Sequence, residues 1–212
     1  MPPLTAFTIT CGVHLNLNEG YPVRKIASSS PLTRADGQFR SRRSVLMHGL
    51  RPSAQFLRLA EDELSAQIEQ FLTSGLIAYH LTTHSHFHIV PALRDLIMRL
   101  ARKFHVGWVR QHRLSATVLP VNPLFTRKHV VTETPNQPNY VVPIIFWTER
   151  APALLAKQID ALQGRIEIVV HPSTVDDATF PIDADYLPAK RYKEMQYLER
   201  FLTLSGLRVQ EN

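Results

Sequence analysis

Residues 76–88 read Leu-Ile-Ala-Tyr-His-Leu-Thr-Thr-His-Ser-His-Phe-His, a short apolar run that passes directly into alternating histidines. The run predicts a strand over residues 76–83, and Gly75 stands where the end of a preceding helix is expected. Residues 90–104 carry apolar side chains at helical spacing, which predicts a helix with Pro91 in its first turn and an inward face of Leu93, Ile97, Leu100 and Ala101. Histidines at such a junction lie where α/β folds place their sites, at the carboxyl end of a parallel strand.

The alternation of strands and helices continues on both sides of this stretch. Apolar and polar residues alternate within residues 6–17, which predicts a strand. We expect further strands at 106–110, 141–147, 165–170 and 207–209, and helices from Pro52-Ser53 to Gly75, at 152–162 and at 186–204. Residues 23–52 lack a sustained period and are predicted to form a long loop, and residues 114–141 are predicted to be irregular. This order favours a parallel α/β sheet or barrel, in a single domain over residues 1–212.

The composition excludes several classes of protein. Of 212 residues, 44% are hydrophobic and 20% are charged, as in ordinary globular chains. The single cysteine, Cys11, excludes an intramolecular disulfide and thiolate zinc clusters. The sequence shows no membrane-spanning run and no signal-peptide pattern, so we expect a cytoplasmic protein. The net charge is +6, but the basic residues are scattered, apart from a group between Arg34 and Arg43, so we expect no nucleic-acid partner.

The histidines are the strongest functional signal. The chain has 10 of them, and in extended chain His84, His86 and His88 would share one face. His14 lies near the end of the first predicted strand, and His171 follows the strand at 165–170. Imidazoles that converge from three strand ends could hold a divalent metal that activates water. The simpler alternative is a set of polar strand ends whose histidines cap a helix and bond to backbone groups.

Other catalytic schemes have weaker support. Cys11 precedes a glycine inside a strand and is best explained as a small buried side chain. The sequence contains neither a Gly-x-Ser-x-Gly elbow nor a glycine-rich phosphate loop. Asp176 and Asp177 could serve acid–base chemistry, although an exposed loop is the more common place for such a pair.

Several segments together resemble the YdjC-like carbohydrate deacetylases, which include chitooligosaccharide deacetylase and a hopanoid-biosynthesis-associated type. Residues 80–88 resemble that family's His-x-Asp-Ser-His-x-His-x-His element, and residues 12–22 resemble its Gly-x-His-x-x-Leu-Thr-x-Gly-x-Pro element. Residues 31–39 resemble a loop that ends in Asp-Gly-x-Phe, Val109-Arg110 a strand-end arginine, and residues 167–172 a late strand that ends in His-Pro. The order and spacing hold from about residue 6 to residue 209.

The resemblance implies a distorted TIM-like (β/α) barrel of the polysaccharide-deacetylase type. It implies a metal-dependent hydrolase that cleaves a linear amide C–N bond to remove N-acetyl groups from a sugar or glycolipid, with Mg²⁺ or Zn²⁺ as cofactor. His14 and His84 would be the metal ligands, His171 the general acid and Arg110 an orienting group. Three further residues would contact the substrate or support the metal ligands: His86, His88 and Asn16. A homodimer is one arrangement left open.

Two departures from the family pattern set the remaining expectations. Family members begin with a strand that ends in an Asp-Asp-Phe-Gly-like segment, whereas this sequence begins at what corresponds to the third strand, so the barrel is expected to be incomplete at its N-terminus. The aspartate expected before the histidines is Thr82. If the acid pair is absent, activity is in question, and Asp176 or Asp177 would be the substitutes. The alternative function is a catalytically inactive, degenerate barrel that binds a sugar or a protein partner.

Overall fold

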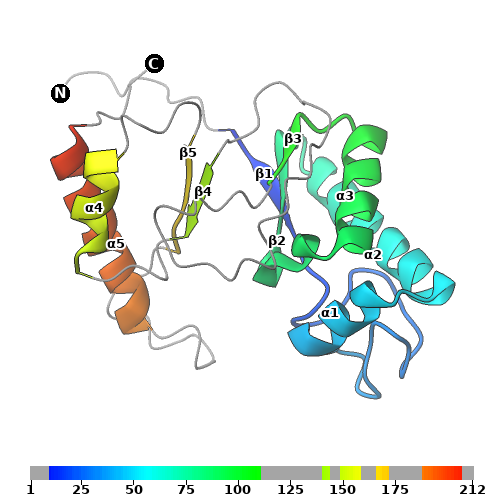
Figure 1. Ribbon diagram of the computed structural model, residues 1–212. Helices are drawn as coiled ribbons and strands as arrows, with labels where there is room; N and C mark the ends of the chain where they lie inside the picture. The colour runs from blue at the N-terminus through cyan, green and yellow to red at the C-terminus, as the bar shows by residue number, and fades with distance from the viewer. Residues whose placement is uncertain (1–9, 111–139, 144–148, 159–165, 172–187, 207–212) are drawn as a thin grey trace. The chain divides into compact units, whose positions relative to one another are not determined.

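The computed structural model describes residues 10–110, 140–143, 149–158, 166–171 and 188–206, which are drawn in colour in Figure 1. These residues belong to two compact units. We call residues 10–110 the N-terminal unit and the described residues from 140 to 206 the C-terminal unit.

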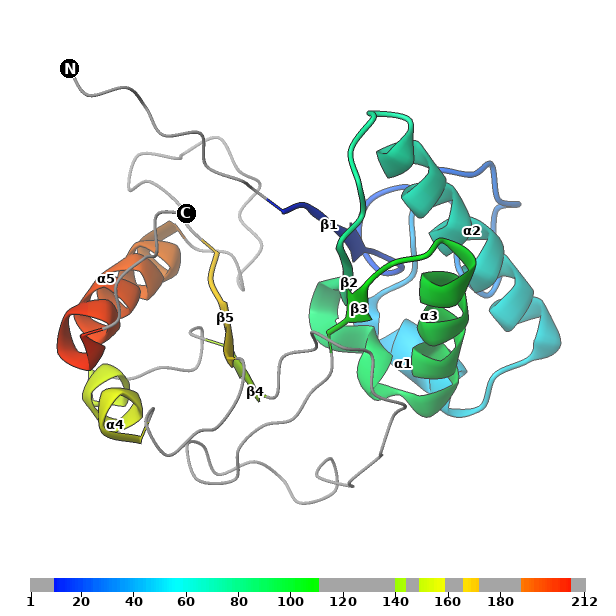
Figure 2. The same cartoon turned by 90° about the horizontal axis from the view of Figure 1, so that it is seen from above.

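The N-terminal unit is a three-stranded parallel sheet with helices on one side. Its strands are β1 (Gly12–Leu15), β2 (His80–Thr83) and β3 (Trp108–Val109), in the spatial order β1-β2-β3. The connections contain α1 (Arg42–Leu50), α2 (Ala54–Leu72), the 3₁₀ segment η1 (His84–Ile89) and α3 (Pro91–Lys103). Helices α2 and α3 lie on the same side of the sheet, as the two views in Figures 1 and 2 show. This β-α-β order places the carboxyl ends of neighbouring strands side by side.

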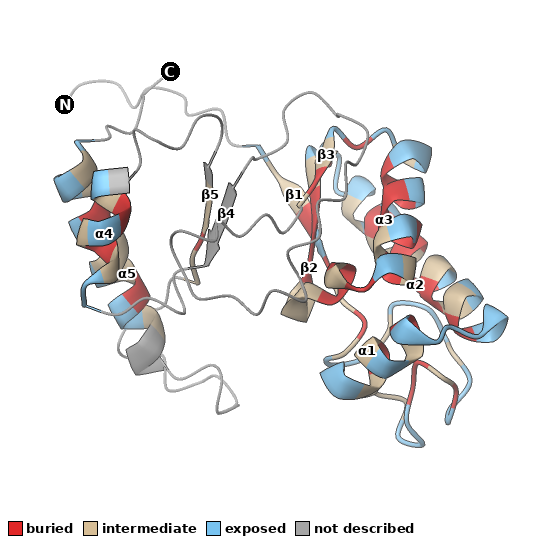
Figure 3. Cartoon of the chain, in the orientation of Figure 1, coloured by how far each residue is buried: buried red, intermediate tan, exposed pale blue. Residues whose placement is uncertain are grey.

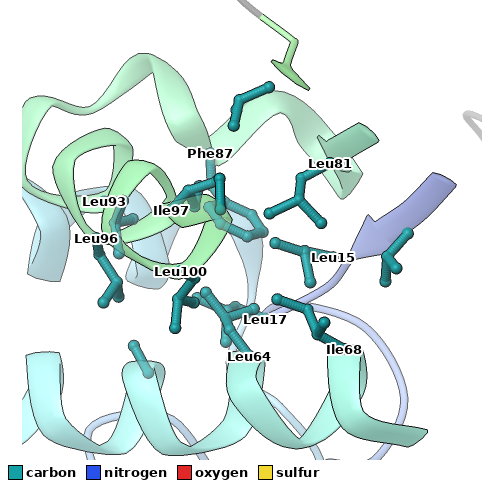
Figure 4. Close-up of a cluster of buried hydrophobic side chains, with 14 of the residues drawn as sticks. Leu15, Leu17, Leu64, Ile68, Leu81, Phe87, Leu93, Leu96, Ile97 and Leu100 are labelled. Atoms are coloured by element: carbon teal, nitrogen blue, oxygen red, sulfur yellow. The ribbon is translucent and has the colours of Figure 1, made fainter. Parts of the chain in front are cut away.

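The core of this unit lies between the sheet and those helices. Val13, Leu15, Leu81 and Val109 of the strands are buried in this core. Figure 3 shows buried positions on the sheet and on α2 and α3. The strand residues meet a helical stripe in the cluster of Figure 4, in which the labelled residues are Leu15, Leu17, Leu64, Ile68, Leu81, Phe87, Leu93, Leu96, Ile97 and Leu100. Full burial of a leucine or phenylalanine side chain contributes about 1.5–3 kcal/mol, so this cluster anchors the strand ends.

The two long helices form as their sequences predict. Helix α2 begins after Ser53, whose side chain accepts a hydrogen bond from the Phe56 N–H. Helix α3 begins at Pro91, and its predicted inward face of Leu93, Ile97, Leu100 and Ala101 is buried. Gly75 has φ +78°, the conformation expected just beyond a helix end, although α2 itself ends at Leu72.

The prediction of a long loop over residues 23–52 is wrong in part, because α1 occupies residues 42–50. Ser41 caps this helix by accepting the Ser44 N–H. Only Val45 and Gly49 of α1 are buried. Gly49 packs closely against Val90 and Leu93, which belong to the connection between β2 and β3. A nine-residue helix with two buried positions shows no clear period in the sequence.

The C-terminal unit pairs two parallel strands and two helices. Strands β4 (Tyr140–Pro143) and β5 (Ile166–Val169) pair with Val141 opposite Glu167, and α4 (Ala151–Gln158) packs against α5 (Pro188–Ser205). Leu155 and Phe201 are fully buried at the helix contact. No helix among the described segments is both long and apolar enough to cross a bilayer.

The fold class is therefore mixed α/β with parallel strands, as predicted. The described strands at 12–15, 80–83, 108–109, 140–143 and 166–169 fall within or beside the predicted ones and are shorter. Residues 114–139, the predicted strand at 207–209, and Asp176 and Asp177 lie outside the described residues.

Candidate functional site

The sheet of the N-terminal unit has one apolar face and one polar face. Because strand side chains alternate, Val13 and Leu15 face the helical core, while His14 lies on the opposite face and is exposed. His14 pairs in register with Thr82 of β2. Arg110 follows β3 directly, is half-buried, and donates its backbone N–H to Leu81 O at 2.9 Å, so the β2–β3 ladder continues to it. His14 thus lies on β1 and Arg110 follows β3, on the two strands that flank β2.

Thr82 sets the orientation of His14. Their Nδ1 and Oγ1 atoms lie 2.7 Å apart, and Thr82 is buried. When Nδ1–H donates to the threonine oxygen, the lone pair of His14 is on Nε2, which is the tautomer that binds a metal through Nε2. The position at which the sequence comparison expects an aspartate is thus occupied by a neutral partner of the predicted ligand.

The histidines that follow β2 do not share one face, so that prediction is wrong. The chain leaves extended conformation at η1, where Ser85 has φ 54° and His86 has φ 55°. Two successive residues in the left-handed region turn the chain sharply. As a result, His84 remains at the strand end, whereas His88 points back to a buried position against Thr83 Oγ1. The rings of His86 and His88 lie edge to face with centroids 6.0 Å apart.

His14 and His84 come together at the ends of adjacent strands. Their ring centroids are 5.7 Å apart in an edge-to-face arrangement. Two imidazoles bound to one tetrahedral zinc ion have ring centres about 5 Å apart, because each Zn–N bond is about 2.0–2.1 Å. The ring separation of His14 and His84 is close to this value. No group of three His, Cys, Asp or Glu side chains with metal-binding geometry occurs within the described part of the chain.

A carboxylate that sequence reasoning missed lies against His84. Glu19 Oε2 lies 2.6 Å from His84 Nε2, with the Glu19 side chain about half exposed. It brings a negative charge to the end of β2 beside the His84 ring. In the sequence Glu19 is only one residue of the turn that ends the first predicted strand. Glu19 and His84 are far apart in the chain, so no local sequence pattern predicts their contact.

The turn that carries Glu19 is built by Asn16. Asn16 Oδ1 accepts the N–H groups of Asn18 and Glu19, and its Nδ2 donates to Glu19 O at 2.7 Å. Asn18 Nδ2 in turn donates to Ser85 Oγ at 3.1 Å, which ties this turn to η1. Asn16, predicted as a substrate contact or a supporting residue, thus shapes the backbone next to the two histidines.

A pocket opens beside Glu19. It has a volume of about 310 Å³, at the small end for ligand sites. Its polar character comes in part from Arg34 and Arg40, of which Arg34 is paired with Asp36 at 3.0 Å. The residues that line it are Asn18, Glu19, Gly20, Arg34, Gln38, Phe39, Arg40, Ser41 and Ser44.

At the start of the strands, a stacked pair fills the polar face. The His80 ring lies nearly parallel to the Trp108 ring with centroids 4.5 Å apart, and the two residues are register partners. Gly12, the register partner of His80 on β1, leaves room for this ring, since an added Cβ would lie 2.2 Å from His80 Nε2. The ring of Trp108 therefore packs on His80 within the sheet.

In the C-terminal unit, His171 follows β5 as predicted and is held by a glutamate. Glu194 of α5 is buried, and its Oε2 accepts the His171 backbone N–H at 2.8 Å and faces His171 Nδ1 at 3.1 Å. These contacts fix the ring and favour the proton on Nδ1. Sequence reasoning missed Glu194, although the sequence holds a signal: it is an acid at helical spacing from the buried Phe201.

Comparisons with known proteins identify the family of this chain. A model of the YdjC-like protein family matches residues 2–200. A carbohydrate deacetylase of Listeria monocytogenes serotype 4b is 30% identical over 187 residues, which cover 88% of this chain and 68% of that protein. Carbohydrate deacetylases of Xenopus laevis and Danio rerio are 30% and 32% identical over 54% and 47% of this chain. The aligned segment spans about a third of these two proteins, 35% and 32% of their lengths.

A solved structure supports the fold. A crystal structure from Enterococcus faecalis V583, named as that of a candidate cellobiose-phosphate cleavage protein, superposes with a TM-score of 0.64. The match covers 96% of this chain and 76% of that one, at 18% identity.

Proposed function

This chain belongs to the YdjC-like protein family, and from that premise we propose that it is a metal-dependent hydrolase that removes N-acetyl groups from a carbohydrate or glycolipid. The observation that carries the proposal is the meeting of His14 and His84 at adjacent parallel strand ends, with ring centroids 5.7 Å apart. The relatives named carbohydrate deacetylase supply the class of substrate.

In this proposal His14 and His84 hold a divalent cation, Mg²⁺ or Zn²⁺, through their imidazole nitrogens. When bound, such a cation polarises the acetyl carbonyl and lowers the pKa of water. We propose that the Nδ1–H of His14 donates to Thr82 Oγ1, 2.7 Å away, which leaves Nε2 for the cation. His88 is buried against Thr83 and supports the loop, whereas His86, which is half-buried, remains the candidate for substrate contact.

His171 is proposed as the general acid that protonates the departing amine at cleavage of the linear amide C–N bond. A positioned acid typically contributes about 10²–10⁴-fold to such a reaction. The support for this role is its strand-end position and the buried Glu194, which holds Nδ1 so that Nε2 is the nitrogen that exchanges the proton. Arg110 is proposed to orient the substrate from the end of β3.

The pocket beside Glu19 suits a polar substrate such as a sugar ring. Its walls carry hydroxyl, amide and guanidinium groups that can bond to sugar hydroxyls. For the whole chain we propose one domain over residues 1–212 in which the parallel strands belong to a distorted TIM-like barrel of the polysaccharide-deacetylase type.

The proposal is tested by metal binding and acetate release together. Purified protein is titrated with Zn²⁺ and Mg²⁺ by calorimetry, and acetate is measured after incubation with N-acetylglucosamine oligomers. Metal binding that is lost in His84→Ala, together with metal-dependent acetate release, supports the proposal. Sugar binding without acetate release under any metal would contradict it and would favour a sugar-binding protein without hydrolase activity.

A further inference from the structure

Helix α2 carries a fully buried acid. Glu63 is 0% exposed, and it lies on the core-facing stripe of α2 beside Leu64. Its Oε1 accepts the Val23 N–H and its Oε2 accepts the Arg24 N–H, each at 2.9 Å. A buried carboxylate is costly unless hydrogen bonds compensate for lost hydration, and here both oxygens are bonded to the chain that follows β1.

Gln67, one helical turn further along α2, binds the start of the same segment. Its Oε1 accepts the Asn16 N–H at 2.9 Å, and its Nε2 donates to Asn16 O at 2.7 Å. The side-chain amide therefore satisfies both backbone groups of Asn16, as a neighbouring strand would. Gln67 Nε2 also donates to Glu63 Oε1 at 2.7 Å, which links the two side chains into one network.

Together Gln67 and Glu63 bind the backbone at both ends of the segment 16–24. Between these ends lies the turn in which Asn18 bonds to Ser85 and Glu19 contacts His84. The same turn forms one wall of the pocket. The backbone that carries Glu19 is thus fixed from α2, on the core side of the sheet.

We propose that Glu63 and Gln67 are positioning residues that hold the segment 16–24 so that Glu19 faces His84 and lines the proposed substrate pocket. This inference rests on the proposed function for its catalytic consequence, but the positioning itself is a property of the chain alone. A displacement of about 1 Å at a reacting site can cost about 10²-fold in rate, so a fixed turn has a measurable effect.

The first experiment reads the positioning without activity. The ring signals of His84 are recorded by NMR at one fixed pH in the wild type and in Glu19→Gln, Glu63→Gln and Gln67→Ala. Glu63→Gln is nearly isosteric but places an amide N–H₂ against backbone N–H donors. We expect both α2 variants to move the His84 signal in the same direction as Glu19→Gln, with faster amide exchange at Val23 and Arg24.

Matched controls lie on the same helix. Glu69→Gln and Gln70→Ala make similar changes at exposed positions of α2, and we expect them to leave the His84 signal in place. If Glu63→Gln fails to fold, Gln67→Ala decides the outcome, because Gln67 is only half-buried. A folded Gln67→Ala protein with an unmoved His84 signal would overturn the proposal.

The second experiment is a double-mutant cycle on acetate release. We expect Gln67→Ala to lower kcat/KM by about tenfold in the wild type, but by less than about twofold in the Glu19→Gln background, because the loss passes through Glu19. Full multiplication of the two losses would show general destabilisation and would overturn the proposal. If the wild type releases no acetate, the proposed function fails, and the NMR comparison still decides the positioning role.

Discussion

His14 and Thr82 are register partners on parallel strands, and Nδ1 of the histidine lies 2.7 Å from the threonine hydroxyl. Replacement of Thr82 by valine keeps the shape of the side chain but removes the hydroxyl that is hydrogen-bonded to His14 Nδ1. We expect Thr82→Val to weaken Zn²⁺ binding by about tenfold, as loss of a partner behind a metal ligand commonly does. Calorimetric titration measures this. The hydroxyl of Thr83 is hydrogen-bonded to His88 instead, so Thr83→Val should weaken Zn²⁺ binding less. An equal loss of Zn²⁺ affinity in both variants would contradict the role assigned to Thr82.

Metal affinity should depend on His84, as on His14, more than on the other histidines tested. We expect His84→Ala to lower divalent-metal affinity by about tenfold or more, because the ligands come from different strands and one imidazole alone makes a poor site. His86→Ala should cause a smaller loss. His48, which stacks on Phe56 with ring centroids 5.2 Å apart, is the control and should have no effect. Similar losses in all three variants would indicate nonspecific binding.

His171 should affect the reaction rate without affecting the metal. We expect His171→Ala to lower kcat by about 10²–10⁴-fold, the usual contribution of general acid catalysis, while metal content stays unchanged. Elemental analysis and acetate release on the same preparation check both halves of the prediction. A variant that has lost its metal would assign His171 to ligation.

Glu194 should act through His171. Glu194→Gln removes the charge that fixes the His171 ring, so we expect kcat to fall by about tenfold, with little further loss when His171 is already alanine. Glu199→Gln is the matched change at an exposed position of α5 and should leave kcat unchanged. Independent losses in the double variant would argue for a structural role of Glu194.

The close approach of Gly12 to His80 predicts a stability effect. A Cβ at residue 12 would lie 2.2 Å from His80 Nε2, so Gly12→Ala forces the ring away from Trp108. We expect a loss of about 1–3 kcal/mol in the free energy of unfolding, measured with urea. In a His80→Ala background the same change should cost far less. An unchanged cost there would place the strain elsewhere.

The sequence predicted those features of the fold that are set by residues a few positions apart. The apolar periods of α2 and α3 and the strand-end positions of His14, His84 and His171 follow from patterns a few residues long. The helix at 42–50 was missed because only Val45 and Gly49 of its nine residues are buried. A pattern needs more apolar positions than this to be visible.

Contacts between residues that are distant in the sequence could not be predicted from local patterns. The pairing of His14 with Thr82 depends on strand register, and the contact of Glu19 with His84 depends on how the turn is held. Glu63 and Glu194 left a trace, since each is an acid on an otherwise buried helical stripe. A charged residue in such a stripe is rarely buried without a partner, so it indicates a specific contact without identifying it.

The left-handed backbone at Ser85 and His86 has a consequence for how this protein can change over time. Residues with side chains cost about 1–2 kcal/mol each in that conformation, and glycine adopts it freely. Glycine at residue 85 or 86 would remove this backbone cost, but it would add entropy to the unfolded chain. Ser85→Gly would also forfeit the bond from Asn18 and let the turn relax, and His86→Gly would lose the ring contact with His88. Relief of the backbone cost and retention of the histidine geometry compete for the same two positions, so relatives with glycine there are the place to look for compensating changes around residue 18.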